Sequence, residues 1–365
     1  MSGPAAALPW WADYVALPLL NLLLALALAA LVVLATGSSP LEAVAALARG
    51  AFGDGEAVGY TLYYATDMVF AGLAVAVAFH AGLFNIGVEG QAYLGGLGAA
   101  LVCLGLPGLP SWLLAPLAIG GAALFGAGWA AIPGWLQARR GSHVVVTTIM
   151  FNFIAYALMV YLLVNVLIAP GQMAPETRPF VPAAALPSMQ AMLAALGLAT
   201  AATPLNAAFL LALAALALAW AVIWHTRWGY ALRVVGASPR AALYAGIDPG
   251  RQIVLAMLFS GALAGGVAVN EVLGAQHKLL VGFTAGYGFT GIAVALMGRN
   301  HPVGILLAAV LFGALYQGGA EMAFDLPRIS SNLVVAIQGL VILTTGGLAL
   351  LLRPLLVRVI VGRGQ

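Results

Sequence analysis

Long runs of hydrophobic residues follow one another along most of the chain, separated by short polar segments. The runs are rich in Ala and Leu and do not alternate between apolar and polar positions, which favours helices over strands. Because a helix needs about 20 apolar residues to cross a bilayer, the pattern predicts ten spans, of which the eighth is short. They are residues 15–37, 59–81, 86–106, 112–135, 144–168, 205–225, 252–273, 284–298, 303–319 and 331–352.

The composition supports a membrane protein. Only 7% of the 365 residues are charged and 63% are hydrophobic, whereas soluble domains carry about 25% charged residues. We therefore predict an all-α, polytopic transmembrane helical bundle, since helices satisfy their own backbone polar groups in lipid. No segment between the spans is long enough to fold alone. Residues 1–365 are thus expected to form one transmembrane domain, with a first part at 15–168 and a second part at 205–352.

The basic residues are distributed unevenly between the predicted loops. If the N- and C-termini are both cytoplasmic, ten of the 14 Lys and Arg residues lie on the cytoplasmic side, and most acidic residues lie outside. The positive-inside rule favours this orientation. Membrane topology therefore explains the net charge of +3 without a nucleic-acid partner.

Two stretches of the chain resemble each other. "FAGLAVAVAFHAGLFNIGVEGQ", from Phe70, and "FSGALAGGVAVNEVLGAQHK", from Phe259, both begin Phe-x-Gly, continue as a small-residue helix and end near a polar turn. In the predicted topology they run in opposite directions, as in transporters with inverted repeats, whose substrate path lies between the repeats near the bilayer midplane. The alternative is chance similarity between helices rich in Ala and Gly.

The longest cytoplasmic loop, residues 227–252, predicts a short helix of its own. Ser238 can cap this helix, Pro239 suits its first position, and Gly246 can end it. A short helix in a loop has little to bury against. It is either a docking element for a soluble partner or an interfacial helix on lipid, and the residues alone do not separate these interpretations.

This loop resembles the coupling loop of ABC importer membrane subunits in the branched-chain amino acid, ribose and nucleoside group. The matching positions are Trp228, Gly229, Arg233, Val235, Gly236, Ser238, Pro239, Ala241, Ala242, Gly246 and Ile247. Three more stretches, "GLFNIGVEGQ", "VVTTIMFNFIA" and "GYGFTGIAVALMGRNHPVG", look most like the nucleoside-type permeases.

The resemblance implies a permease subunit of an ATP-driven nucleoside importer in a bacterial-type inner (plasma) membrane. Its expected partners are a second permease, forming a heterodimer, a cytoplasmic ATPase and an extracytoplasmic substrate-binding lipoprotein. The chain itself has no GxxxxGK[ST] motif, so we expect no enzyme activity and no bound cofactor, with ATP and Mg held by the ATPase. The residues expected to couple to that ATPase are Arg233, Gly236, Ser238, Pro239, Arg240, Ala242, Leu243, Gly246 and Ile247.

Two alternatives remain open at this point. The first keeps the ABC class but changes the substrate to a simple sugar such as ribose. The second is a secondary transporter driven by an ion gradient, with Asp67 and Glu89 as coupling carboxylates, because ionisable residues inside spans are costly and are candidates for function.

A nucleoside needs hydrogen bonds for its ribose and base and aromatic rings for stacking. The residues of these types that we expect along the substrate path are Asn85, Glu89, Gln91, Phe84, Asp67, Asn152, Asn270 and Phe289. For Glu89 the alternative is capping of the N-terminus of its own helix, and for the aromatic residues it is ordinary packing. The five His and the single Cys show no metal-ligand spacing.

Overall fold

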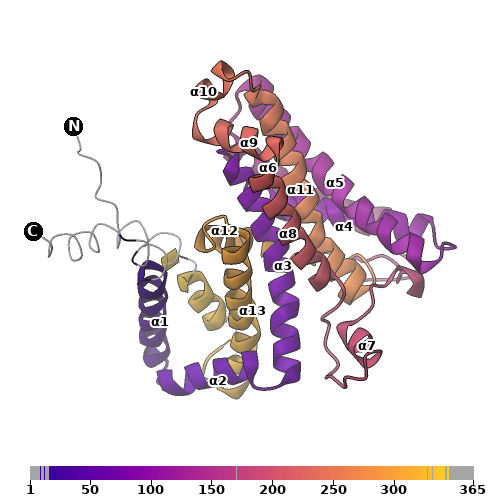
Figure 1. Ribbon diagram of the computed structural model, residues 1–365. Helices are drawn as coiled ribbons and strands as arrows, with labels where there is room; N and C mark the ends of the chain where they lie inside the picture. Colours follow the sequence, from indigo (N-terminus) through magenta and orange to yellow (C-terminus); the bar gives the residue numbers. More distant parts are fainter. Residues whose placement is uncertain are drawn as a thin grey trace, which may run out of the picture. The chain divides into compact units, whose positions relative to one another are not determined.

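The computed structural model describes Pro9, Ala12 and residues 16–344 except Pro170, Pro327, Ser331 and Ile342. Within this part the regular structure is helical, and β-type pairing is limited to isolated bridges, which confirms the all-α prediction. The α-helices (Figure 1) are α1 (Leu17–Ala35), α2 (Pro40–Phe52), α3 (Gly55–His80), α4 (Val88–Gly105), α5 (Ser111–Arg140), α6 (Val144–Asn165), α7 (Met189–Ala194), α8 (Ala208–His225), α9 (Arg227–Ala237), α10 (Pro239–Tyr244), α11 (Pro249–Ala268), α12 (Tyr287–Met297) and α13 (Pro302–Asp325). A shorter apolar helix covers Asn332–Val341, and Pro182–Ala184 forms a 3₁₀ turn and Val269–Gln276 a π-helix.

The chain forms two compact units, one from residues 1–53 and 314–365 and the other from residues 54–313. In the first unit, Ala29 and Val33 of α1 and Ala43 and Ala46 of α2 belong to one apolar core, together with Met322 of α13. The prediction of one domain with parts at 15–168 and 205–352 follows a different division of the chain and stays a prediction.

Six helices in the described residues are long and apolar enough to cross a membrane, or seven if α1 and α2, which are bent by 115° relative to each other, form one span. The chain is thus a multi-pass helical protein, but the count of ten spans stays a prediction. Helix α12 has only 11 residues, and α4 is not among the six. The last predicted span, 331–352, and both termini extend outside the described residues.

Helix α3 is buried on almost all sides in the second unit. It runs antiparallel to α11 (Figure 1), so that Phe70 packs on Gly266 and Ser260 bonds to the carbonyl of Ala74. A helix that is hydrophobic all round is expected in the interior of a bundle. The two stretches that resemble each other in sequence therefore lie side by side in opposite directions.

Helix α5 also lies directly against α11, and the contact depends on small residues. A Cβ atom added at Gly261 would overlap the carbonyl oxygen of Gly126, and one at Gly265 would lie 2.8 Å from the carbonyl carbon of Ala122. Small residues of this kind let the backbones of membrane helices approach closely.

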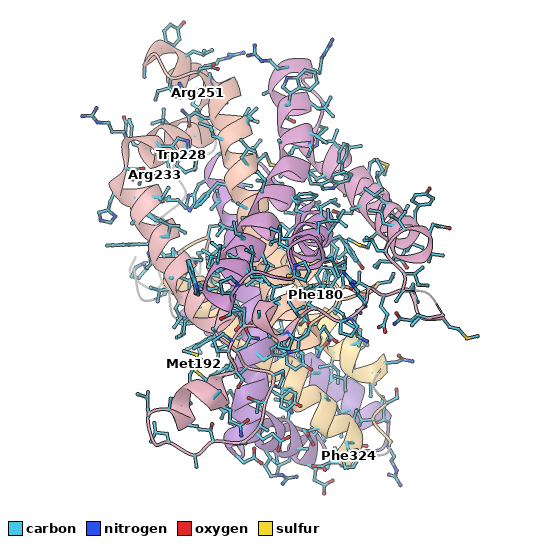
Figure 2. All side chains as sticks on the ribbon, turned by 90° about the vertical axis from the view of Figure 1, so that its right-hand side faces the viewer. Phe180, Met192, Trp228, Arg233, Arg251 and Phe324 are labelled. Carbon is cyan, nitrogen blue, oxygen red and sulfur yellow. The ribbon has the colours of Figure 1, made fainter. Side chains whose placement is uncertain are left out.

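The long connection between α6 and α8 is tied to the segment that follows the π-helix. Thr177 donates its N–H to the carbonyl of Leu279 at 2.9 Å, and Phe180 donates to the carbonyl of His277 at 2.8 Å. Glu176 and Lys278 form an ion pair at 2.7 Å. This connection lies far from the 227–252 loop, because Figure 2 shows Trp228, Arg233 and Arg251 toward one end of the unit and Met192 of α7 toward the other.

The close contact between α5 and α11 predicts that Gly261→Ala lowers the thermal stability of the purified protein in detergent. Overpacking of this kind costs about 1–3 kcal/mol. Gly120→Ala on α5 is the matched control, since nothing lies within 4 Å of the added Cβ. Equal melting temperatures for the two variants would show that the small residue at this contact is dispensable.

Candidate functional site

The helical path of the chain is interrupted between α3 and α4. Helix α3 ends at His80, Gly82 has a φ of 74°, and α4 begins at Val88. A left-handed φ is readily adopted by glycine, which has no Cβ atom. The chain thus leaves the helix between the predicted spans 59–81 and 86–106, and the backbone groups of residues 81–87 must find partners outside a regular helix.

Asn85 holds the broken segment to two other helices. Its Nδ2 donates to Gln91 Oε1 at 3.0 Å and to Ser260 Oγ of α11 at 2.8 Å. Its Oδ1 accepts from the N–H of Gly87 at 2.9 Å and from Gln91 Nε2 at 3.2 Å. Asn85 is fully buried, so it uses its polar atoms to close the turn that leads into α4.

Asn152 of α6 satisfies the backbone on both sides of the start of α4. Its Nδ2 donates to the carbonyl of Ile86 at 2.9 Å, and its Oδ1 accepts from the N–H of Gly90 at 2.9 Å. A buried backbone group without a partner is costly. The amide of Asn152 therefore replaces the hydrogen bonds that a continuous helix would have supplied.

Glu89 lies in the first turn of α4, but its carboxylate caps a different helix. Its Oε1 accepts from Thr284 Oγ1 and from the N–H of Gly286, and its Oε2 accepts from the N–H of Gly288 at 2.8 Å. These donors lie just before and within the first turn of α12. Glu89 thus lies in the first turn of its own helix, as predicted, while its carboxylate oxygens bind the start of α12, so that this side chain joins the two helix N-termini.

Within the described residues, the other four predicted path residues make no side-chain hydrogen bond to this group. Asp67 and Asn270 bond to each other at 2.8 Å in a second buried cluster. The group at the break contacts α3 at Ala74, whose carbonyl accepts from Ser260. Asp67 lies seven residues before Ala74, or about 10 Å along α3. Phe84 is half-buried and its ring lies 5.1 Å from that of Phe79. Phe289 is 49% exposed. The structure thus brings together Asn85, Gln91, Asn152 and Glu89, and places Asp67 and Asn270 in a separate cluster. Phe84 and Phe289 adjoin the first group along the chain, next to Asn85 and to Gly288, whose N–H binds Glu89.

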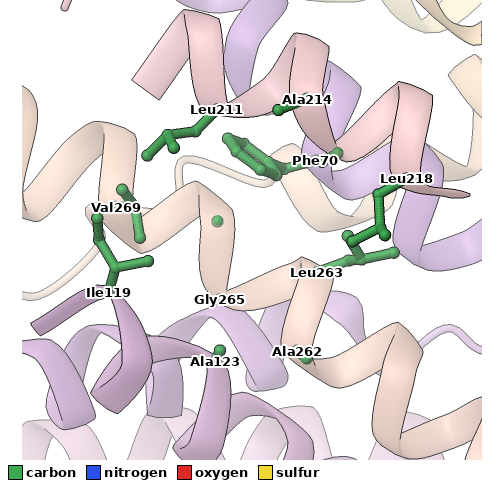
Figure 3. Close-up of a pocket in the computed structure, with 12 residues that line it drawn as sticks. Phe70, Ile119, Ala123, Leu211, Ala214, Leu218, Ala262, Leu263, Gly265 and Val269 are labelled. Atoms are coloured by element: carbon green, nitrogen blue, oxygen red, sulfur yellow. The ribbon is translucent and has the colours of Figure 1, made fainter. Parts of the chain in front are cut away.

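An apolar groove of about 360 Å³ lies between α3, α5, α8 and α11 (Figure 3). Phe70, Leu211, Leu218 and Leu263 are among its lining residues, and all 12 are apolar or glycine. A ligand with several hydroxyl groups needs hydrogen-bond partners in its site. This groove offers no polar side chain and is therefore no site for a nucleoside or a sugar.

The predicted short helix in the 227–252 loop is confirmed as α10. Ser238 Oγ accepts from the N–H of Ala241 at 3.3 Å, Pro239 occupies the first turn, and Gly246 has a φ of 74°. Ala242 is buried, whereas Leu243 is 62% exposed. The apolar residues of α10 are therefore divided between the interior and the surface.

Just before α10, the end of α9 lies against the break. A Cβ atom added at Gly236 would overlap the carbonyl oxygen of His80 and lie 3.0 Å from the N–H nitrogen of Gly82. His80 also makes a 3.1 Å hydrogen bond to the carbonyl of Asn300. The 227–252 loop and the 81–87 segment are thus in direct backbone contact.

A family model described as "Branched-chain amino acid transport system / permease component" matches residues 57–345. The chain belongs to this family. The 81–87 break, the polar group beside it and α10 all lie within the matched part of the permease.

Curated proteins from several organisms are similar to this permease. The guanosine ABC transporter permease protein NupP of Bacillus subtilis is 37% identical over 89% of this chain and 92% of its own length. The glucose ABC transporter permease protein TsgB13 of Haloferax volcanii is 34% identical over 93% and 89%. The nucleoside ABC transporter permease protein NupB of Lactococcus lactis is 33% identical over 85% of each chain.

Bacillus subtilis and Lactococcus lactis each have a second permease protein that is similar to this chain. NupQ of Bacillus subtilis and NupC of Lactococcus lactis are 26% and 28% identical to this chain over 69% and 74% of its length. In each of these organisms the two permease proteins are named for one substrate class.

Several residues around the break were not predicted from the sequence. Ser260 and Thr284 are the side-chain partners of Asn85 and Glu89, and Tyr244 of α10 is 97% exposed. Hydroxyl groups in apolar helices are common, and nothing in their local sequence marks them. Tyr244 differs from these two, because an aromatic residue in a short capped helix is itself a local indication of a docking surface.

The role of Asn152 at the break predicts that Asn152→Ala destabilises the permease. The change leaves the carbonyl of Ile86 and the N–H of Gly90 without their partners, and each buried unsatisfied group costs about 1–3 kcal/mol. Asn165→Ala is the matched control on the same helix, because Asn165 is exposed and bonds only one turn back, to Tyr161. Equal melting temperatures of the two variants in detergent would contradict the bridging role.

Proposed function

We propose that this permease is the membrane subunit of an ATP-driven importer for nucleosides. The observation that carries the proposal is its 37% identity to a guanosine permease over 89% of the chain. Membership of an ABC permease family also weighs against the alternative of a secondary transporter driven by an ion gradient.

In this proposal the substrate passes beside the 81–87 break. Irregular backbone at membrane depth is tolerated only where protein or a water-filled cavity surrounds it. Asn85, Gln91, Asn152 and Glu89 gather there, and amide and carboxylate groups suit the hydroxyls and base edges of a nucleoside. Their oxygens and nitrogens are occupied by protein partners in this structure, so binding requires some of these bonds to exchange for bonds to substrate.

The predicted topology completes the proposal. Ten spans with both termini in the cytoplasm would put α10 on the cytoplasmic side, and the antiparallel α3 and α11 fit an inverted repeat. The energy would come from a separate ATPase, since the chain has no nucleotide-binding motif. A second permease and an extracytoplasmic binding lipoprotein complete the expected complex, and the paired relatives support a heterodimer.

Helix α10 is the proposed docking element for the ATPase. Leu243 and Tyr244 project from it with exposed fractions of 62% and 97%, and Arg240 is exposed beside them. Exposed aromatic and arginine side chains are enriched among residues that dominate binding energy at interfaces. The backbone contact between Gly236 and the His80–Gly82 turn then gives the docked helix a direct connection to the break.

A simple sugar is the second candidate substrate, and one observation favours it. The permease is 34% identical to a glucose permease over 93% of the chain. The polar group at the break would serve either substrate, because both present hydroxyl groups.

Competition experiments distinguish the two substrates. We expect nucleosides, and not glucose or ribose, to displace a labelled nucleoside from the cognate binding lipoprotein and to inhibit uptake by the reconstituted complex. Competition by sugars alone would replace the nucleoside proposal with the sugar proposal. No uptake of either class with ATP present would contradict both.

Removing the exposed side chains of α10 is expected to uncouple the complex. Loss of an aromatic anchor at an interface costs about 2 kcal/mol, or roughly 30-fold in affinity. The double variant Leu243→Ala/Tyr244→Ala should therefore lose uptake and substrate-stimulated ATP hydrolysis while the permease keeps its melting temperature.

Tyr161→Ala on α6 is the control for that experiment, because Tyr161 is also an exposed aromatic residue, at 60%, but lies outside the loop. Normal assembly, hydrolysis and uptake in the α10 double variant would exclude the coupling role.

A further inference from the structure

The second buried polar cluster lies where α3 meets the π-helix at Val269–Gln276. Tyr63 donates its hydroxyl to Glu271 Oε1 at 2.6 Å, and Asn270 Nδ2 donates to Asp67 Oδ2 at 2.8 Å. Asn206, just before α8, donates to Asn270 Oδ1 at 3.0 Å. Because Tyr63 and Asp67 are four residues apart on α3, they present their polar groups to the same side of the helix.

This cluster contains two acidic groups and, among the residues that the structure describes, no cationic partner. Asp67 is fully buried and Glu271 is 4% exposed. The two acids lie in one cluster, because Asp67 binds Asn270, the chain neighbour of Glu271, and Glu271 binds Tyr63, one helical turn before Asp67. Neither ion pair found in the described residues involves them. Asp67 Oδ1 is buried without a hydrogen-bond partner.

The neighbouring elements contribute no positive charge to the pair. The titratable group that faces it from α3 is Tyr63, whose hydroxyl binds Glu271. Helix α12 contributes Tyr287, which interacts with Tyr63. The segment before α8 contributes the neutral Asn206. Apart from the two acids, the titratable groups around the pair are therefore phenols.

Two ionised carboxylates in contact inside a bundle repel each other and have lost their hydration. Two neighbouring like charges in a buried, low-dielectric site are not both ionised at ordinary pH, and a pair of adjacent carboxyl groups holds one proton between its oxygens. A proton on Asp67 Oδ1 would turn the one oxygen without a partner into a donor to Glu271. The same proton removes one of the two buried negative charges.

A metal cation fits this arrangement less well. Such an ion needs several oxygen ligands, but Asn270 presents its Nδ2 donor to Asp67 and uses its Oδ1 to accept from Asn206. Tyr63 likewise points a donor at Glu271. Donors directed at both carboxyl groups suit a pair that retains one negative charge and one proton.

We propose that Asp67 and Glu271 form a binding site for one shared proton, which fastens α3 to the π-helical segment. π-Helical turns occur frequently at functional sites, and this one places Asn270 and Glu271 side by side toward α3. The proposal is independent of the transported substrate, because it concerns a contact within the permease.

Infrared spectroscopy of the purified full-length protein tests the shared proton directly. At neutral pH, the wild type should show the carbonyl band of a protonated carboxyl group, and Asp67→Asn and Glu271→Gln should each remove the same band. Glu56→Gln is the control, since Glu56 is an exposed carboxylate on the same helix, and its spectrum should keep the band.

Thermal unfolding provides the second measurement. The folded protein holds a proton that the unfolded chain releases at neutral pH, so the melting temperature of the wild type should fall as the pH rises. Asp67→Asn should flatten this dependence because its amide can donate to Glu271 at any pH. If Asp67→Asn fails to fold, Glu271→Gln serves for both measurements.

Three outcomes would overturn the proposal. The first is the absence of a protonated carboxyl band in the wild type, and the second is a band that survives both Asp67→Asn and Glu271→Gln. The third is a higher melting temperature of the wild type in Na⁺ than in a large organic cation at equal ionic strength, together with the loss of this difference in Asp67→Asn. That result would assign the site to a metal ion.

Discussion

A chain that breaks its helix inside a membrane protein must find new partners for the exposed backbone groups. Lipid offers no hydrogen bonds, so these partners have to come from the protein. At the break they come from two side chains, since Asn85 closes the turn and Asn152 bridges its two sides. Glu89 in turn binds backbone N–H groups at the start of α12 and ties the new helix to it. The arrangement of α4, α6, α11 and α12 around the break follows from this requirement.

The same requirement explains the small residues around the break. A side chain can satisfy the backbone of another helix only if the two helices approach closely. Gly90 receives Asn152 in this way, and Gly288 lies directly against Glu89. Glycine at these positions therefore serves the polar network as well as the packing.

The local sequence predicted the parts of this structure that depend on local chemistry. The short helix α10, its Ser238 cap and the break at Gly82 follow from turn and capping preferences of a few residues. The partners of Asn85 and Glu89 did not follow, because Ser260 and Thr284 lie 175 and 195 residues away along the chain. Helix α2 was missed because its sequence is less apolar than that of the spans, and it was assigned to a loop. Glu89 was placed in the right turn, but only the tertiary structure shows which helix its charge stabilises.

The contact between α9 and the break has a mechanical consequence. Gly236 and the His80–Gly82 turn meet through their backbones, with no flexible side chain between them to absorb a displacement. Closely packed groups transmit strain, because interiors have few voids into which atoms can move. A shift of the loop that carries α10 must therefore displace the start of the 81–87 segment, and Asn85 lies three residues beyond Gly82. The hydrogen bonds that Asn85 makes to Gln91 and Ser260 are the first ones that such a displacement would strain.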